Sequence, residues 1–267
     1  MSEASKSSLH QMASDAGEDA PLLSRKVLFS GLSFALFGLT GLLLSLTVFP
    51  MCYLLPVTRA KRQRWSRTVL SRVFPTFIRF MKICGLIQVR HQNFDILQSG
   101  GRLIVANHPS LLDVVYLIAS VENANCLVKP SLFFNPFTAG TVRAAGYIRN
   151  DSDTLLQRAT ESLRAGDTLI VFPEGTRTHP DKPFRFLRGA ANIALEAGSD
   201  VWPVTIRCTP ARLMKNQSWY EMSRSTLQVS LTAHPPLEVA PYLDDSLPRS
   251  RQSRRLTRDL EAFYTAQ

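Results

Sequence analysis

The sequence lacks the residue patterns that mark metal sites and disulfide frameworks. Its four cysteines form no C-x-x-C pair, and its five histidines form no H-E-x-x-H pair. Isolated cysteines are typical of reduced packing residues in a protein that faces the cytosol. We therefore expect no metal site, and we expect four free thiols: Cys52, Cys84, Cys126 and Cys208.

Two long stretches lack charge of one or both signs. No charged residue occurs from Val27 to Thr58, and no acidic residue occurs from Arg59 to Arg90, where nine residues are basic. A basic block beside an apolar run is typical of a segment that lies on an anionic membrane surface. Nucleic acid is the other candidate partner, but the interleaved residues "VFPTFIRFMKICGLI" favour an interfacial helix. The pattern therefore favours a membrane over nucleic acid.

The uncharged run from Val27 to Thr58 is long enough to cross a membrane, which takes about 20 apolar residues. We favour a single span. The alternative is a re-entrant or interfacial helical hairpin, with Arg72, Arg79 and Lys82 on the polar side of its second helix. Five positive charges follow the run within Arg59–Arg67. The positive-inside rule therefore places the C-terminal body in the cytoplasm, at the inner (plasma) membrane if the protein is bacterial.

Strand and helix patterns alternate after about residue 88, and no internal repeat is present. Apolar runs predict strands over 102–107, 125–129, 167–172, 201–208 and 225–234. Amphipathic patterns predict helices over 109–120, 154–166, 188–198 and 249–265. This order predicts an α/β fold, with a mixed sheet covered by helices behind an N-terminal membrane helix or helical hairpin. Residues 1–24 are polar and are expected to be disordered, and residues 25–87 form the expected membrane-anchoring segment.

The stretch "NHPSLLD" follows the first predicted strand and places His108 five residues before Asp113. Proline favours the first position of a helix, so we expect a helix that begins at Pro109, with His108 just outside it. Asp113 would then lie near the end of the first turn and reach back to the imidazole. A carboxylate on one ring nitrogen leaves the other free to take a proton from a hydroxyl. The alternative is that the histidine caps the helix and the aspartate is a helix N-terminal charge.

Three further motifs contain candidate binding residues. "FPEGTR", Phe172–Arg177, follows a predicted strand directly, which is where α/β sheets bind ligands, and Arg177 could fork onto a phosphate. "AAGYIRN" contains Gly146 and Arg149, which is a second candidate phosphate ligand or a surface arginine. "VWPV", 201–204, is an apolar strand whose proline indicates an edge or a bend.

Taken together and in this order, the motifs resemble those of the lysophosphatidic acid acyltransferase family of glycerolipid acyltransferases. That family has N-H-x4-D, G-x-I-x-R-type, F-P-E-G-T-R and V-P-[VI]-type motifs. They match here as Asn107–Asp113, Gly146–Arg149, Phe172–Arg177 and Val201–Val204. The second match is compact, and the fourth has a tryptophan before its proline. The resemblance covers roughly residues 80–235, within an expected acyltransferase domain at 88–267.

The resemblance implies transfer of an acyl group from acyl-CoA or acyl carrier protein to the free hydroxyl of a lysolipid. The foremost acceptor is 1-acyl-sn-glycerol-3-phosphate, which would give phosphatidic acid. His108 would be the general base and Asp113 would orient it. No cofactor beyond the thioester co-substrate is implied, and without a G-x-S-x-G elbow no acyl-enzyme is expected.

The resemblance also implies a set of substrate-binding residues in or near the motifs. These are Asn107, Lys129, Gly146, Arg149, Glu174, Gly175, Thr176 and Arg177, although Lys129 could equally be a solvated surface lysine. The alternative acceptors are a lyso-ornithine lipid or another lysophospholipid. A silent membrane-binding scaffold is a further alternative, and the intact motifs argue against it.

Overall fold

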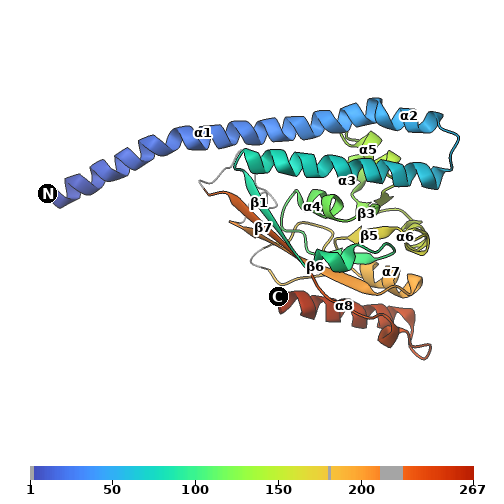
Figure 1. The fold of residues 1–267 in the computed structure, drawn as a ribbon. Helices are drawn as coiled ribbons and strands as arrows, with labels where there is room; N and C mark the ends of the chain where they lie inside the picture. The colour runs from blue at the N-terminus through green and yellow to red at the C-terminus, as the bar shows by residue number, and fades with distance from the viewer. Residues whose placement is uncertain (1–2, 180–181, 211–224) are drawn as a thin grey trace.

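A computed structural model describes residues 3–179, 182–210 and 225–267, with a seven-stranded mixed sheet at its centre (Figure 1). The strand order is β1-β7-β6-β2-β5-β3-β4, and only the β6–β7 pair is antiparallel. The strands are β1 (Ile87–Gln92), β2 (Leu103–Ala106), β3 (Ala124–Val128), β4 (Ile148–Arg149), β5 (Thr168–Val171), β6 (Val201–Thr209) and β7 (Leu227–Ala233). The predicted mixed α/β sheet is thus confirmed.

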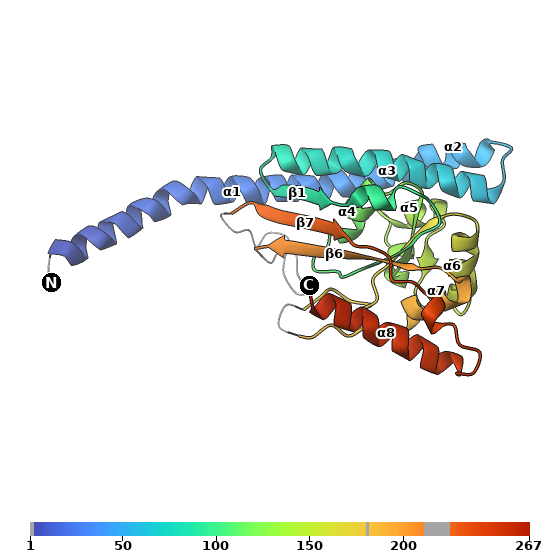
Figure 2. The same cartoon turned by 60° about the horizontal axis from the view of Figure 1, so that its bottom comes forward.

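Helices cover both faces of this sheet (Figures 1 and 2). On one face lie α3 (Arg59–Ile83), α4 (Asp113–Ser120) and α5 (Ala139–Ala144), with α1 (Glu3–Leu46) and α2 (Val48–Leu54) outside them. On the other face lie α6 (Leu155–Arg164), α7 (Gly189–Ala197) and α8 (Arg249–Thr265). The helix expected over 249–265 is present with those bounds.

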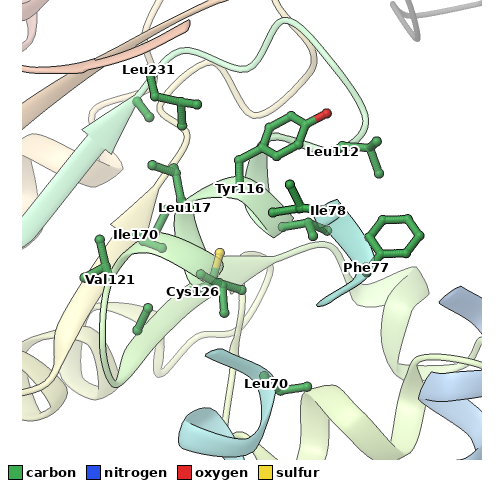
Figure 3. Packing of buried hydrophobic residues seen from close by; sticks show 14 of the residues in the cluster. Leu70, Phe77, Ile78, Leu112, Tyr116, Leu117, Val121, Cys126, Ile170 and Leu231 are labelled. Atoms are coloured by element: carbon green, nitrogen blue, oxygen red, sulfur yellow. The ribbon is translucent and has the colours of Figure 1, made fainter. Parts of the chain in front are cut away.

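Alternate residues of the central strands supply two separate cores. In β2, Leu103 and Val105 pack with the α6–α8 side, whereas Ile104 packs with the α3–α4 side. Period-2 side-chain alternation places successive residues on opposite faces of a sheet. Because both faces are covered, every residue of β2 is apolar and fully buried. Figure 3 shows the α3–α4 side, where Phe77 and Ile78 of α3 lie beside Tyr116 of α4.

Three local predictions differ from the structure. The helix expected from Pro109 begins at Asp113, for a reason given below. Pro203 lies inside β6 rather than at an edge or a bend. The Pro203 carbonyl accepts a hydrogen bond from the His234 N–H at 3.0 Å, just beyond the last β6–β7 residue pair. The N–H that proline lacks is therefore not needed for the pairing of β6 with β7. The backbone is helical from Glu3, although disorder was predicted for residues 1–24. Extending a helix costs little once its first turns have formed, and here the apolar run supplies those turns.

The N-terminal helices form a hairpin in which α1 and α2 run antiparallel to α3 (Figure 1). The end of α1 packs closely on α5, because Gly41 faces the backbone of Phe137 and Gly140 faces Ser45, with no room for a β-carbon at either glycine. The hairpin is therefore part of the folded body. Its shape is that of the helical hairpin which the sequence left as the alternative to one isolated span.

One face of α1 remains apolar and exposed. Leu28, Leu32, Leu36, Leu39 and Leu43 follow one another at helical spacing, and each is at least 40% exposed. Among the described residues, one helical stretch, Arg25–Leu54, is long and apolar enough to cross a membrane by length and composition. This exposed stripe supports association with a membrane.

A buried ion pair fastens α3 to the sheet. The Arg67 guanidinium lies 2.8 Å from Asp167, which precedes β5, and also donates to the Ala145 carbonyl at 2.8 Å. Asp167 also accepts hydrogen bonds from Asn123 and Ser162. Burial opposes ionisation of Asp167, but Arg67 and these hydrogen bonds outweigh it and lower the carboxyl pKa.

Replacing Arg67 by Ala should therefore destabilise the protein strongly, because Asp167 stays charged and buried with only the exposed Arg64 as a cation, 3.1 Å away. We expect a loss of roughly 3–5 kcal/mol in the free energy of unfolding. Because the folded pKa of Asp167 is lowered, the pair stabilises the fold above the unfolded pKa near 3.8, and this contribution is lost as pH falls through the folded pKa. Denaturant unfolding near neutral pH and in acid measures both effects.

The matched control is Arg249→Ala, which breaks the exposed pair of Arg249 with Glu196. An exposed pair contributes about 1 kcal/mol or less. Equal losses for the two variants would contradict the role assigned to Arg67.

Candidate active site

Two of the motifs emerge at the same edge of the sheet. β2 and β5 are parallel neighbours, paired from Leu103 with Leu169 to Val105 with Val171. The residues that follow each strand, Asn107–Asp113 and Phe172–Arg177, therefore lie next to one another. This is the carboxyl edge, where open α/β sheets bind their ligands.

Asp113 is a fully buried carboxylate that is held by hydrogen bonds from its own loop. Its Oδ2 accepts from His108 Nδ1 at 2.8 Å and from the Ser110 backbone N–H at 2.6 Å, and its Oδ1 accepts from Ser110 Oγ at 2.6 Å. A buried carboxylate needs such donors, because its desolvation is otherwise very costly. The predicted contact between the imidazole and Asp113 is thus present.

Ser110 explains why α4 starts late. Its Oγ donates to Asp113 and accepts from the Leu112 N–H at 3.3 Å, so residues 110–112 form a turn around the carboxylate. Short hydroxyl side chains favour such turns over helix. The helix predicted from Pro109 would have included Ser110, and the position of this serine three residues before the aspartate is the sequence signal for the turn.

The His108 ring is oriented on two sides. Nδ1–H donates to Asp113, which fixes the tautomer with Nε2 as the acceptor nitrogen. The ring stacks on Phe172, with centroids 4.4 Å apart and planes 29° apart. The imidazole remains 22% exposed, so its other nitrogen can meet a substrate.

The FPEGTR segment and the residue after it are hydrogen-bonded to the backbone of His108. The His108 N–H donates to Thr178 Oγ1 at 2.9 Å and to Glu174 Oε1 at 3.2 Å, and the Thr178 N–H donates to the His108 carbonyl at 2.7 Å. Burial raises the pKa of Glu174, and hydrogen bonds from the Thr178 hydroxyl and the His108 N–H only partly offset this rise. Glu174 thus positions the histidine. Thr178, one residue past the motif, was missed by the sequence analysis.

Gly175 makes the bend that turns this segment past His108. Its φ is +64°, a conformation that suits glycine, and its N–H donates to the Phe172 carbonyl at 3.1 Å. A β-carbon there would lie 2.9 Å from the Leu187 side chain. Thr176 and Arg177 follow the bend and are half-buried.

Asn107 completes the sheet at this edge. Its side-chain amide donates to the Ile206 carbonyl at 2.8 Å and accepts from the Ile206 N–H at 2.7 Å. These bonds continue the β2–β6 pairing one residue past Ala106, where the backbone ladder ends. The structure gives this buried side chain a scaffolding contact, and the substrate contact that the resemblance implied stays a prediction.

Comparison with known proteins agrees with this geometry. Residues 87–207 match the family model described as Acyltransferase. The chain is 29% identical over 151 residues to a 1-acyl-sn-glycerol-3-phosphate acyltransferase of Chlamydomonas reinhardtii, over 53% of this chain and 45% of the relative. It is 32% identical over 135 residues to one of Helicobacter pylori, over 48% of this chain and 56% of the relative. The chain spans about half the length of these curated relatives.

The fold is also that of a solved relative. The crystal structure of the 1-acyl-sn-glycerophosphate (LPA) acyltransferase PlsC from Thermotoga maritima superposes with a TM-score of 0.67 over 91% of this chain and 97% of that one, at 22% identity. We refer to residues 87–207, which match this family model, as the acyltransferase domain. The family resemblance inferred from the four motifs is thereby confirmed.

The acyltransferase domain does not bring every expected binding residue to the dyad. Lys129 is exposed at the end of β3, and Arg149 on the edge strand β4 pairs with Asp151 through bonds of 3.0 and 2.9 Å. Two strands, β5 and β3, separate β4 from β2. Gly146 lines a different cavity, described below.

One half-buried thiol, Cys208, lies near Asp113 of the dyad. Burial, then the neighbouring Asp113, raises the pKa of Cys208 to about 12. A thiol with such a pKa stays protonated near neutral pH and is a poor nucleophile. Cys208 therefore acts as a packing residue, as the sequence indicated.

Replacing Asn107 by Leu should destabilise the acyltransferase domain, because both backbone groups of Ile206 lose their partners in the interior. Each unsatisfied buried group costs about 1–3 kcal/mol, so we expect a loss of roughly 2–6 kcal/mol in the free energy of unfolding. Denaturant unfolding measures it, with the exposed Asn150→Leu as control. An unchanged unfolding midpoint for Asn107→Leu would show that the amide is dispensable to the fold.

Proposed function

We propose that the protein transfers a fatty acyl group from a thioester to the free hydroxyl of a lysolipid, foremost 1-acyl-sn-glycerol-3-phosphate, to give phosphatidic acid. The observation that carries this proposal is the oriented dyad, in which the His108 imidazole is held 2.8 Å from a fully buried Asp113 beside the FPEGTR segment. The named relatives support the same acceptor.

The geometry supports direct transfer by general-base catalysis. Nε2 of His108 takes the proton of the acceptor hydroxyl while its oxygen attacks the thioester carbonyl carbon. Asp113 stabilises the imidazolium that forms. The tetrahedral oxyanion then collapses, the carbon–sulfur bond breaks, and the imidazolium returns its proton to the leaving thiolate. No acyl-enzyme is needed, because Ser110 is engaged with Asp113 and the Cys208 thiol stays protonated.

Arg177 is the foremost ligand for the acceptor phosphate. It follows the Gly175 bend on the segment that holds His108, and a guanidinium can bind a phosphate through two parallel hydrogen bonds. Arg149 would assist only by exchanging its exposed partner Asp151 for the phosphate. Lys129, exposed at the same edge, would add a point charge.

A lyso-ornithine lipid is the second candidate acceptor. The chain is 36% identical over 109 residues to a lyso-ornithine lipid O-acyltransferase of Pseudomonas aeruginosa, over 39% of this chain and 42% of that protein. The donor for either acceptor would be acyl-CoA or acyl carrier protein, without a further cofactor.

A lipid substrate also suits the surroundings of the dyad. Leu111, in the loop between His108 and Asp113, and Leu187, beside Gly175, are exposed leucines at this edge. With the apolar stripe of α1, they would face the bilayer that holds acceptor and product. The basic residues that follow α2 would keep the acyltransferase domain on the cytoplasmic side, where the thioester donor arrives.

Replacing His108 by Ala should abolish transfer while leaving the fold and membrane association intact. Loss of a general base typically costs roughly 10²–10⁴ in rate. Asp113→Asn should also slow transfer, because the amide cannot stabilise an imidazolium. The assay is transfer of a labelled acyl group from acyl-CoA to lysophosphatidate, resolved by thin-layer chromatography.

His91→Ala is the matched control, because His91 is an exposed histidine at the end of β1, hydrogen-bonded to Ser120. It should retain full activity. Near-normal turnover in a folded His108→Ala protein would refute the proposed mechanism.

Replacing Arg177 by Lys should weaken binding of the acceptor and leave binding of the donor unchanged. The positive charge remains, but the planar guanidinium that can form two parallel hydrogen bonds is lost. The apparent affinity for lysophosphatidate should fall by about 1.5–3 kcal/mol, the contribution of a hydrogen bond to a charged group. The Michaelis constants for lysophosphatidate and acyl-CoA, measured separately, give the comparison, with the exposed Arg251→Lys on α8 as control. A defect confined to acyl-CoA would assign Arg177 to the donor.

A further inference from the structure

A cavity lies at the opposite end of α3 from the dyad. It measures about 340 Å³ and is enclosed by α2, the start of α3, the end of α5 and the start of α6. Four arginines line it, namely Arg59, Arg62, Arg143 and Arg158, and no carboxylate does. Its other lining residues include three aromatic ones, Phe49 and Tyr53 from α2 and Tyr147 just before β4.

This cavity is separate from the catalytic edge. Phe77 and Ile78 of α3 lie near Leu112 and Tyr116, at the start of α4 (Figure 3), and α4 begins at Asp113. From Arg62 to Phe77 the helix rises roughly 22 Å. The phosphate and the reacting hydroxyl of one glycerol phosphate cannot be that far apart, so the cavity is not the acceptor phosphate site.

The positive charges of the cavity are not neutralised within the protein. Among the described residues, no ion pair includes any of its four arginines. Within the described part of the chain, the side chains of Arg62 and Arg143 donate to backbone carbonyls, at 3.0 Å to Val57 and 2.8 Å to Phe133. Burial, then the neighbouring Arg59, lowers the pKa of Arg158. Like charges gathered in this way are stabilised by an anion.

Two buried polar groups of the lining also have unused hydrogen-bonding capacity. The Nε of Arg62 and the hydroxyl of Tyr147 are buried without a hydrogen-bond partner among the described residues. Tyr147 itself is 5% exposed. Buried donors without partners are rare in folded proteins, and they indicate a ligand that accepts hydrogen bonds.

We propose that this cavity binds the phosphate group of an anionic membrane lipid, in a site distinct from the catalytic dyad. The lipid source is indicated by α2, where Met51, Tyr53 and Leu54 are exposed at 67%, 59% and 85% beside the cavity. Apolar side chains next to a cluster of cations match the acyl chains and phosphate of one lipid. Binding there holds the turn between α2 and α3 at the depth of the headgroups.

Cys52 gives a direct readout, because it lines the cavity and its thiol is free. The full-length protein in neutral detergent micelles is reacted with N-ethylmaleimide, and peptide mass spectrometry follows the labelling of Cys52. Bound ligand should slow labelling by the factor 1 + [L]/Kd, or about tenfold at roughly nine times Kd. Phosphatidate in the micelle is expected to protect, whereas phosphatidylcholine and oleate, an anion without phosphate, are not.

Two double variants distinguish binding in the cavity from a general effect of the protein's positive charge. Arg59→Gln/Arg143→Gln should abolish the protection, because both residues line the cavity. Arg251→Gln/Arg254→Gln, which removes the same charge from the exposed face of α8, should retain it. His108→Ala should also retain it, so a failure of the proposed catalysis would leave this result unaffected.

Three outcomes would overturn the proposal. Equal protection by phosphatidate in the Arg59→Gln/Arg143→Gln protein would place the lipid elsewhere. Equal protection by oleate and phosphatidate would show that negative charge at the micelle surface protects Cys52 and that the phosphate group is not required. Protection by acyl-CoA or inorganic phosphate in lipid-free micelles, at concentrations where phosphatidate does not protect, would assign the cavity to a soluble phosphate.

Discussion

The buried charge of Asp113 is the constraint around which the catalytic edge is arranged. A carboxylate without solvent contact must be surrounded by donors, and three converge on it, two of them from Ser110. Meeting that requirement shapes the loop, delays the start of α4 to Asp113 and draws the His108 imidazole into one orientation. The same arrangement that stabilises the charge leaves Nε2 of the histidine as an acceptor, so folding and catalysis depend on one set of hydrogen bonds.

The FPEGTR segment supplies the second half of this arrangement. Glu174 and Thr178 bind the backbone of His108, and Phe172 stacks on its ring. The histidine is thereby fixed from both β2 and β5, two rigid neighbouring strands, while its ring remains open to substrate on one side. The motif thus joins a scaffolding role to the proposed phosphate contact of Arg177, and substitutions within it should be interpreted with both roles in view.

The arginines on and around the N-terminal hairpin fall into two groups with different roles. Arg67 is neutralised by Asp167 and fastens α3 to the sheet, whereas the four arginines of the cavity near the start of α3 face no carboxylate. The first arrangement stabilises the fold, and the second attracts an anion. The exposed apolar stripe of α1 belongs to the same hairpin, and in the proposed function it would face the bilayer.

Local chemistry was enough to predict much of this protein. Strand–helix alternation gave the mixed α/β fold, the terminal helix was located to the residue, and the short separation of His108 and Asp113 predicted their contact. Other features depend on residues distant in sequence. Asn107 binds Ile206, and Thr178 binds His108, only because β2 is flanked by β6 and β5. The order of strands is set by packing both faces of the sheet at once, which the periodicity of any single segment does not encode. For that reason the sequence was enough to identify His108 and Asp113 as the candidate dyad. Only the tertiary structure decided which residues hold them in place.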